Sequence, residues 1–192
     1  MVDSSILRQL AVLILLVVPA AAGETTAPLL LPDLDGSRVN PLSGDAKATV
    51  FLFTRSDCPI SNRYAPEVGR LHERFSRLDV EFWLVYLDPD ETTETIRRHM
   101  KEYGYRLGAL RDPGHELVRR TGAKVTPEAV VFDGSGAMVY RGRIDDRYTA
   151  FGKARVAATR HDLEDALLAV LDGRPVREST TKAVGCFIAD LK

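Results

Sequence analysis

Apolar residues in this sequence gather in short blocks whose spacing predicts alternating strands and helices. Residues 49–54 (TVFLFT) and 80–87 (VEFWLVYL) are rich in β-branched and aromatic side chains, as in strands that are buried on both faces. Between them, apolar or small residues recur at intervals of three and four, the period of an amphipathic helix: Tyr64, Ala65, Val68, Leu71 and Phe75. A second helical pattern spans residues 91–103. The first half of the chain therefore predicts the order strand, helix, strand, helix.

The second half adds a hairpin and a closing helix. Residues 115–121 predict a short helix that ends at a glycine. Residues 129–133 and 138–141 are apolar runs joined by a Gly-Ser-Gly turn, which predicts an antiparallel hairpin. A last helix is predicted over residues 155–171. Strands in both directions with helices between them indicate an α/β fold with three layers and a central mixed β-sheet.

The two ends of the chain differ in character from the predicted domain, residues 23–172. Residues 10–18 are all apolar, and a proline and three alanines follow, which is typical of a secretory signal peptide over residues 1–22. Extended through the alanines, this run has 13 residues, fewer than the roughly 20 that a membrane-spanning helix needs. We therefore expect cleavage, export to the periplasm or the medium, and no stable membrane insertion; an uncleaved anchor is the alternative. The domain opens with a lead-in that has a possible hairpin at Asp35-Gly36, and residues 173–192 form a C-terminal tail.

Composition narrows the classes of function. The chain has 192 residues, 28% charged and 45% hydrophobic, which fits one globular domain. Lys and Arg number 26 against 27 Asp and Glu, so a net charge of -1 gives no reason to expect a nucleic-acid partner. Two cysteines exclude a disulfide-dense scaffold and a four-cysteine zinc site. We expect no cofactor and no metal.

Cys58 is the strongest candidate for chemistry. It lies between the strand at residues 49–54 and the following helix, beside the unpaired N–H groups and the positive end of the helix dipole, which favour a thiolate. Arg55 and Arg63 are expected to lower the pKa of this thiol, and Asp57 to raise it. Export would place both cysteines where disulfides persist. The alternative is a buried structural cysteine.

Three segments carry a resemblance to a known family: FLFTRSDCP at residues 51–59, Val-Thr-Pro at residues 125–127 before a strand, and YRGRI at residues 140–144. Across residues 28–171 the chain resembles the thioredoxin-like superfamily, in particular the redoxin group related to alkyl hydroperoxide reductases and thiol-specific antioxidants. The resemblance implies a thioredoxin-like three-layer sandwich in which Cys58 is the nucleophile. It also implies that a cis-proline faces the cysteine, and that these residues bind substrate: Asp57, Pro59, Ser61, Thr126 and Pro127.

The sequence departs from the family patterns at three positions. Ser61 replaces the second cysteine of the Cys-x-x-Cys motif, so a dithiol cycle within this motif is impossible. Thr54 lies four residues before Cys58, which differs from the peroxiredoxin spacing and puts peroxidase activity in doubt. Asn62 takes the place of the second cysteine that copper-delivering relatives use, which excludes a two-thiolate copper site within this loop.

Cys186, in the tail, has three possible roles. It could resolve a sulfenate or a mixed disulfide on Cys58 and close an internal disulfide. It could form a permanent staple whose loop of 128 residues (186 minus 58) would stabilise the fold by roughly 4–5 kcal/mol in the entropy model. A soft metal ion could also bind the two thiolates.

Three functions follow from these alternatives. The first is an exported thiol–disulfide oxidoreductase that acts on a protein disulfide or a small thiol, with an electron donor that the sequence does not identify. The second is a thiol peroxidase, and the third a non-catalytic module that binds a thiol or a metal.

The other polar residues point less clearly to function. Asn62 and Tyr64 could shape the thiol pocket or simply pack. The four histidines are expected to be solvated helix residues: His72, His99, His115 and His161. A run of alternating charges is either a solvated face or a ring around the site: Arg141, Arg143, Asp145, Asp146 and Arg147.

Overall fold

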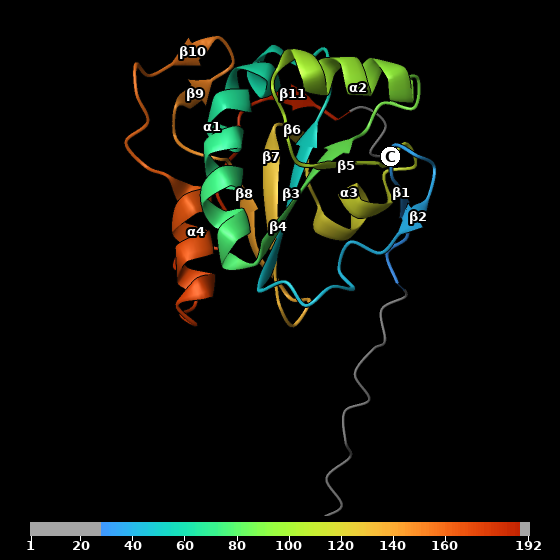
Figure 1. Cartoon of the computed structure of the whole chain (residues 1–192). Coiled ribbons are helices and arrows are strands. Elements are labelled where there is room, and N and C mark those ends of the chain that lie inside the picture. Colours follow the sequence, from blue (N-terminus) through green and yellow to red (C-terminus); the bar gives the residue numbers. More distant parts are fainter. Residues whose placement is uncertain (1–27, 189–192) are drawn as a thin grey trace, which may run out of the picture.

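A five-stranded mixed sheet forms the centre of the protein (Figure 1). The computed structural model describes residues 28–188. The strand order is β5-β4-β3-β7-β8. The strands are β3 (Ala48–Thr54), β4 (Val80–Tyr86), β5 (Gly108–Arg111), β7 (Glu128–Asp133) and β8 (Met138–Gly142). The helices are α1 (Pro59–Phe75), the short 3-10 helix η1 (Ser76–Leu78), α2 (Thr93–Glu102), α3 (Glu116–Thr121) and α4 (Asp162–Leu171). The predicted α/β class with a mixed sheet is confirmed.

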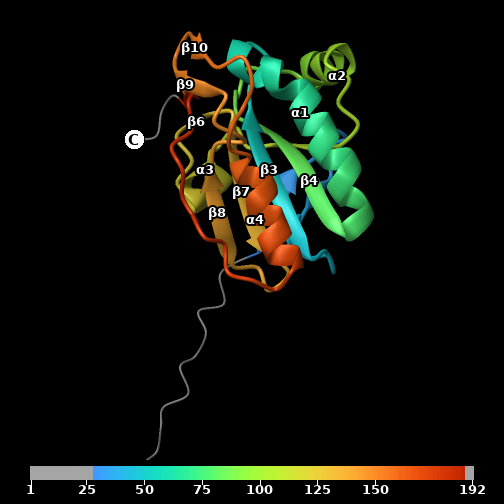
Figure 2. The same ribbon diagram turned by 90° about the vertical axis from the view of Figure 1, so that its left-hand side faces the viewer.

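Strand β3 is the centre of the core. It runs parallel to β4 and antiparallel to β7, and all of its residues are buried. Because successive side chains of a strand point to opposite faces, Val50 and Leu52 pack with α1 and α4, whereas Phe51 and Phe53 pack with α3. Figure 2 shows α1 and α4 in front of the sheet and α3 behind it. This two-sided burial holds the carboxyl end of β3 rigidly, and the candidate nucleophile follows that end.

The segment before α4 differs from the prediction. Instead of a helix from residue 155, the chain forms a hairpin of β9 (Tyr148–Ala150) and β10 (Lys153–Ala154), and the helix begins at Asp162. The Asp146 carboxylate accepts hydrogen bonds from the backbone N–H groups of Thr159 and Arg160, at 2.6 and 3.0 Å, which keep these residues outside the helix. Strand β5, with four residues, was not predicted.

The described N-terminal residues form the hairpin that the sequence predicts. Strands β1 (Leu31–Pro32) and β2 (Arg38–Val39) pair antiparallel, and the Asp33 carboxylate caps the turn by accepting from the N–H of Ser37 at 2.8 Å. Gly36 adopts a φ of 83°, a conformation that glycine tolerates best. The predicted signal peptide lies outside the described residues. Among residues 28–188, no helix has the length and apolar character to cross a membrane.

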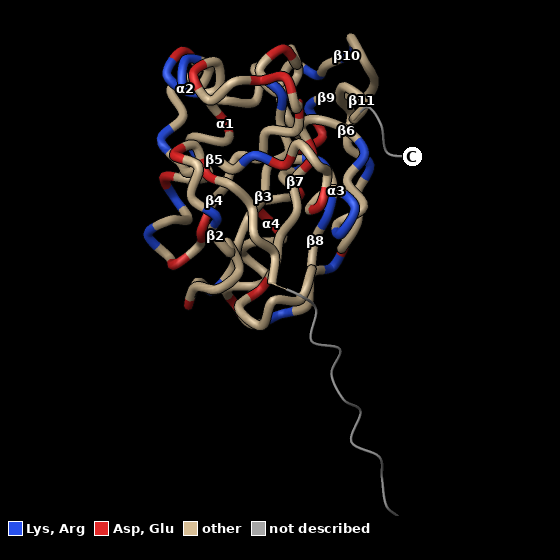
Figure 3. Tube along the Cα trace, turned by 90° about the vertical axis from the view of Figure 1, so that its right-hand side faces the viewer, with Lys and Arg blue, Asp and Glu red and all other residues tan. Residues whose placement is uncertain are grey.

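The C-terminal tail returns to the sheet and crosses its edge. Thr181 is fixed beside β8, where its N–H donates to the Arg141 carbonyl at 3.0 Å and its hydroxyl lies 2.7 Å from the Tyr140 hydroxyl. The tail then forms β11 (Cys186–Phe187), which pairs antiparallel with β6 (Val125–Thr126). Figure 3 shows β11 at the same end of the molecule as β6, in a stretch of the tube without charged residues. Residues 173–188 of the tail are thus part of the folded domain.

Candidate active site

Cys58 is the residue at which helix α1 begins. Strand β3 ends four residues earlier, the N–H of Cys58 donates to the Arg55 carbonyl at 3.2 Å, and the Cys58 carbonyl accepts the N–H of Asn62 at 3.0 Å. Pro59 then occupies the first helical turn, where its missing N–H costs no hydrogen bond. The local sequence therefore places the sulfur between a rigid strand and a helix start, as predicted.

The loop before β7 lies against this sulfur. The Thr126-Pro127 peptide bond is cis, and both residues are buried. The Cys58 Sγ lies 3.0 Å from the Thr126 carbonyl oxygen, to which the thiol can donate. A segment 68 residues away along the chain thus forms one wall of the site.

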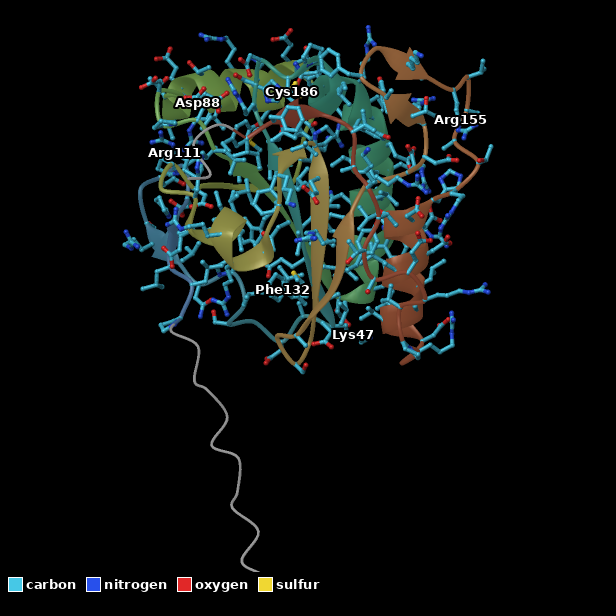
Figure 4. All side chains as sticks on the ribbon, turned by 180° about the vertical axis from the view of Figure 1, so that it is seen from behind. Lys47, Asp88, Arg111, Phe132, Arg155 and Cys186 are labelled. Carbon is cyan, nitrogen blue, oxygen red and sulfur yellow. The ribbon has the colours of Figure 1, made fainter. Side chains whose placement is uncertain are left out.

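The tail brings the second cysteine to the same place. The sulfurs of Cys58 and Cys186 are 2.8 Å apart, and both residues are free thiols. Figure 4 places Cys186 at the end of the molecule opposite Lys47 and Phe132. In β11, Cys186 is the register partner of Thr126, so the strand pairing that holds the tail also aligns the sulfurs.

Gly185 allows the tail to pack directly against the backbone of Thr126. A Cβ atom at this position would lie 2.1 Å from the carbonyl oxygen of Thr126, well inside van der Waals contact. Of the twenty residue types, only glycine fits between β11 and this carbonyl without a shift of the backbone.

The two thiols have opposite acidities. Burial raises the pKa of Cys58, but hydrogen bonds from the Cys186 thiol and from Ser61 outweigh this effect and hold its pKa below the ordinary value. Burial and the hydrogen bond to Cys58 raise the pKa of Cys186 to about 12. Cys58 is therefore the thiolate of the pair, and Cys186, which keeps its proton, donates a hydrogen bond to it. Among the groups that lower the pKa of Cys58, the hydrogen-bond donors around the sulfur have larger effects than the predicted cations Arg55 and Arg63.

Two buried hydroxyl groups beside Cys58 have no other hydrogen-bond partner among the described residues. The hydroxyls of Ser61 and Thr126 are buried and, within residues 28–188, have no hydrogen-bond partner when Cys58 is a thiol. Both are among the groups that lower the pKa of Cys58. Each can turn its O–H toward the sulfur once the sulfur carries a charge.

We expect Ser61→Ala to raise the pKa of Cys58, because the thiolate loses a donor that burial prevents water from replacing. The thiolate absorbance near 240 nm, followed against pH, measures this change. Ser43→Ala, which removes a hydroxyl on an exposed loop, is the control and leaves the titration unchanged. An identical titration for Ser61→Ala would show that its hydroxyl does not reach the sulfur.

A chain of hydrogen bonds holds the loop that precedes Cys58. The Asn62 side-chain amide donates to the Ser56 carbonyl at 2.9 Å, and its oxygen lies 2.8 Å from Nε2 of His99. Nδ1 of His99 lies 2.7 Å from the Tyr86 hydroxyl. The prediction that His99 is solvated is wrong: it is 5% exposed. The residues around His99 in α2 are mostly polar, so the local sequence gives no sign that it is buried. Its hydrogen-bond partners come from other elements, Tyr86 from β4 and Asn62 from α1.

With His99 neutral, both of its ring nitrogens form hydrogen bonds: Nε2–H donates to the Asn62 side-chain oxygen, and Nδ1 accepts from the Tyr86 hydroxyl. Burial lowers the pKa of His99 below its ordinary 6.5, so the folded chain binds fewer protons here than the unfolded chain. This contribution to stability is complete above pH 6.5 and is lost as the pH falls through 6.5 toward the folded-state pKa.

For the wild type we therefore expect a lower free energy of unfolding in urea at pH 5.5 than at pH 7.5. In His99→Gln this decrease between pH 7.5 and pH 5.5 is expected to be smaller. Burial also lowers the pKa of His72. His72→Gln is therefore the matched variant, and it measures how much of the pH dependence of the unfolding free energy comes from His72. A pH dependence in His99→Gln equal to that of the wild type would contradict this assignment.

The remaining predicted substrate residues lie at the rim. Pro59 and Asp57 are exposed, and the Asp57 carboxylate pairs with Arg55 at 2.9 Å. The Arg143 guanidinium pairs with Asp162 at 2.7 Å at the start of α4, so it fixes that helix instead of forming a ring around the site. The Tyr64 hydroxyl donates to Asp145 at 2.5 Å, which ties α1 to the segment after β8.

One group of side chains has the spacing of metal ligands. Oxygen and nitrogen atoms of Glu67, Asp145 and His161 lie within 4.8 Å of one another. The Asp145 Oδ1 already accepts from Tyr64 and from the N–H of Arg147 at 2.9 Å. The group includes neither cysteine.

Comparison with known proteins assigns the family. The sequence profile of the AhpC/TSA family matches residues 22–141, a span that includes both Cys58 and the Thr126-Pro127 loop. The chain belongs to the AhpC/TSA family. Within this family setting, the thioredoxin-like redoxin fold that the motifs predicted is confirmed.

Individual relatives agree with the AhpC/TSA assignment. The chain is 23% identical to the thiol-disulfide oxidoreductase ResA of Halalkalibacterium halodurans over 62% of this chain and 67% of that protein. An uncharacterized conserved protein from Geobacillus kaustophilus shares 30% identity and a TM-score of 0.73 over 84% of this chain and 87% of that chain. A secreted Mycobacterium tuberculosis disulfide oxidoreductase homologous to DsbE shares the fold, with 18% identity and a TM-score of 0.55 over 74% of this chain and 96% of that chain.

Proposed function

We propose that this AhpC/TSA-family chain is a thiol–disulfide oxidoreductase in which Cys58 and Cys186 cycle between a dithiol and an internal disulfide. The observation that carries the proposal is the 2.8 Å contact between the two sulfurs, beside the cis Thr126-Pro127 bond. The name of the ResA relatives supports the reaction class.

The two cysteines would divide the chemistry according to their acidity. Cys58, whose pKa is lowered, is the nucleophile when a disulfide sulfur is attacked and the leaving group when its own disulfide opens. Cys186 then loses its proton and attacks the mixed disulfide at Cys58, the bond between Cys58 and the substrate breaks, and the second substrate sulfur leaves as a thiol. The balanced reaction is one external disulfide plus the protein dithiol giving two external thiols plus the protein disulfide. It runs in either direction, and an external thiol is the electron donor.

The polypeptide edge at Thr126 supports a protein substrate. In this fold an extended chain can pair with the strand before the proline, and β11 already makes that pairing with Val125 and Thr126. In the dithiol form a substrate segment would displace β11 and use the same backbone groups, which also uncovers Cys58. Ser61 and Thr126 would stabilise the thiolate, and Asp57 and Pro59 at the rim would contact the substrate.

Mapping the disulfide tests this proposal directly. Trypsin releases Cys58 in residues 56–63 and Cys186 in residues 183–192, so the oxidised chain yields one linked pair that separates on reduction. We expect this pair in the oxidised protein and reduction of insulin disulfides by the dithiol form. Two unlinked peptides after oxidation would contradict the proposal.

The family assignment favours peroxide reduction as a second candidate function. Peroxide would oxidise the Cys58 thiolate to a sulfenate, and Cys186 would condense with it to release water and form the same disulfide. Consumption of hydrogen peroxide by the dithiol form, at a rate above that of free cysteine, separates this function from disulfide exchange alone.

We also propose that the chain acts outside the cytoplasm. The apolar segment at residues 10–18 supports export, and one structural relative is a secreted disulfide oxidoreductase. A fusion of residues 1–27 to alkaline phosphatase, which is active only after export, tests this step: activity is expected, and an inactive cytoplasmic fusion would contradict it.

A further inference from the structure

The two cysteines of the proposed redox pair differ in their exposure to solvent. Cys58 is 1% exposed, enclosed by the Thr126 carbonyl, Cys186 and the core under α1. Cys186 is partly exposed. It lines a groove of about 820 Å³ between the tail and the β9–β10 hairpin, and Cys58 does not line this groove. Figure 1 shows β11 at the upper end of the sheet, between β6 and the start of α1.

We propose that external thiols open the Cys58–Cys186 disulfide by attacking the sulfur of Cys186, from this groove. The proposal rests on the proposed function and adds which sulfur forms the bond to the partner. The partner's thiolate forms a bond with the Cys186 sulfur, the bond between Cys186 and Cys58 breaks, and Cys58 leaves as a thiolate. A second partner thiolate then attacks the partner's own sulfur in this mixed disulfide. The partner disulfide departs, and the Cys186 sulfur takes up a proton.

The acidities of the two thiols favour this direction. In thiol–disulfide exchange, the sulfur with the lower pKa leaves faster. The pKa of Cys58 is lowered and that of Cys186 is raised to about 12, so attack at Cys186 expels the better leaving group. Attack at Cys58 would expel the poorer one and would need entry into the core.

The charges in the groove suit an incoming anion. Lys124 and Lys182 line it, and its one acidic residue, Glu128, is paired with Arg141 at 3.7 Å. The exposed rings of Phe151 and Phe187 flank the opening, 69% and 82% exposed. A thiolate can therefore approach Cys186 without meeting an unpaired carboxylate among the residues that line the groove.

Glutathione is the probe for the exchange itself. The oxidised wild-type chain is mixed with reduced glutathione for short times, quenched with excess N-ethylmaleimide, and digested with trypsin. We expect glutathione on residues 183–192 and maleimide on residues 56–63. Glutathione on residues 56–63, or equal amounts on both peptides, would overturn the proposal. Failure to form the internal disulfide would instead contradict the proposed function, and this proposal with it.

A second measurement tests access without the disulfide. In Cys58→Ser only Cys186 remains, and in Cys186→Ser only Cys58; each reacts with 5,5′-dithiobis(2-nitrobenzoate) at pH 8. Despite its lower pKa, we expect Cys58 to react at least about tenfold more slowly, because the reagent cannot reach a buried sulfur. Equal rates, or a faster Cys58, would overturn the proposal. Circular dichroism of both variants verifies that they are folded.

Discussion

Replacement of Cys58 by serine abolishes reduction of insulin disulfides, with an expected loss of at least about a hundredfold, because covalent catalysis loses its nucleophile. Serine keeps the size of the side chain, but its hydroxyl stays protonated at neutral pH, so the Ser61, Thr126 and Cys186 donors have no anion to stabilise. Turbidity of the released insulin chains, with dithiothreitol as electron donor, measures the rate.

The matched variant for this experiment is Cys186→Ser. It removes the second sulfur but leaves Cys58 beside the Thr126 carbonyl, so it cannot form the internal disulfide, and a mixed disulfide on Cys58 forms only when a substrate segment displaces β11. An urea unfolding curve for each variant separates loss of chemistry from loss of fold. Insulin reduction by Cys58→Ser at the wild-type rate would end the assignment of Cys58 as the nucleophile.

Substitution of Gly185 by alanine separates the two sulfurs without removing either one. The new Cβ would lie 2.1 Å from the Thr126 carbonyl oxygen and 2.6 Å from its carbon, both of which are backbone atoms that cannot rotate away. The strand pairing between β11 and β6 must therefore loosen, and Cys186 moves away from Cys58. We expect the internal disulfide to form at least about tenfold more slowly, which corresponds to only about 1.4 kcal/mol.

Gly69→Ala is the control for this substitution. It lies in α1, where a Cβ atom would meet nothing within 4 Å, so the same chemical change leaves the sulfurs in contact and favours the helix. Non-reducing tryptic maps after a timed exposure to diamide measure the linked peptide pair in both variants. Equal disulfide formation in Gly185→Ala and Gly69→Ala would mean that β11 docking does not align the cysteines.

Much of the scaffold could be predicted because its elements are long and periodic. The buried run at residues 49–54, the amphipathic pattern after Ser61 and the hairpin after residue 129 all specify local structure, and they place Cys58 at a helix start. The short pieces could not be predicted. Strand β11 has two residues and β5 has four, too few for a period to be visible.

The same limit applies to the contacts of the site. The pairing of Cys186 with Cys58 spans 128 residues and depends on one glycine against one carbonyl, a contact that no local pattern encodes. His99 was misjudged for the same reason, since its burial comes from α1 and β4 rather than from its own helix. Sequence patterns identified the reactive sulfur, whereas its contact with Cys186 depends on the folded tail.

The anchoring of the tail beside β8 also has a consequence for the behaviour of the protein in concentrated solution. Strand β8 is the last strand of the sheet, and the backbone of Arg141 is occupied by Ser179 and Thr181 at 2.9 and 3.0 Å. Unpaired strand edges invite pairing with other chains. By pairing with Arg141, the segment that supplies the second sulfur also covers part of this edge, and we expect it to hinder pairing of β8 with other chains.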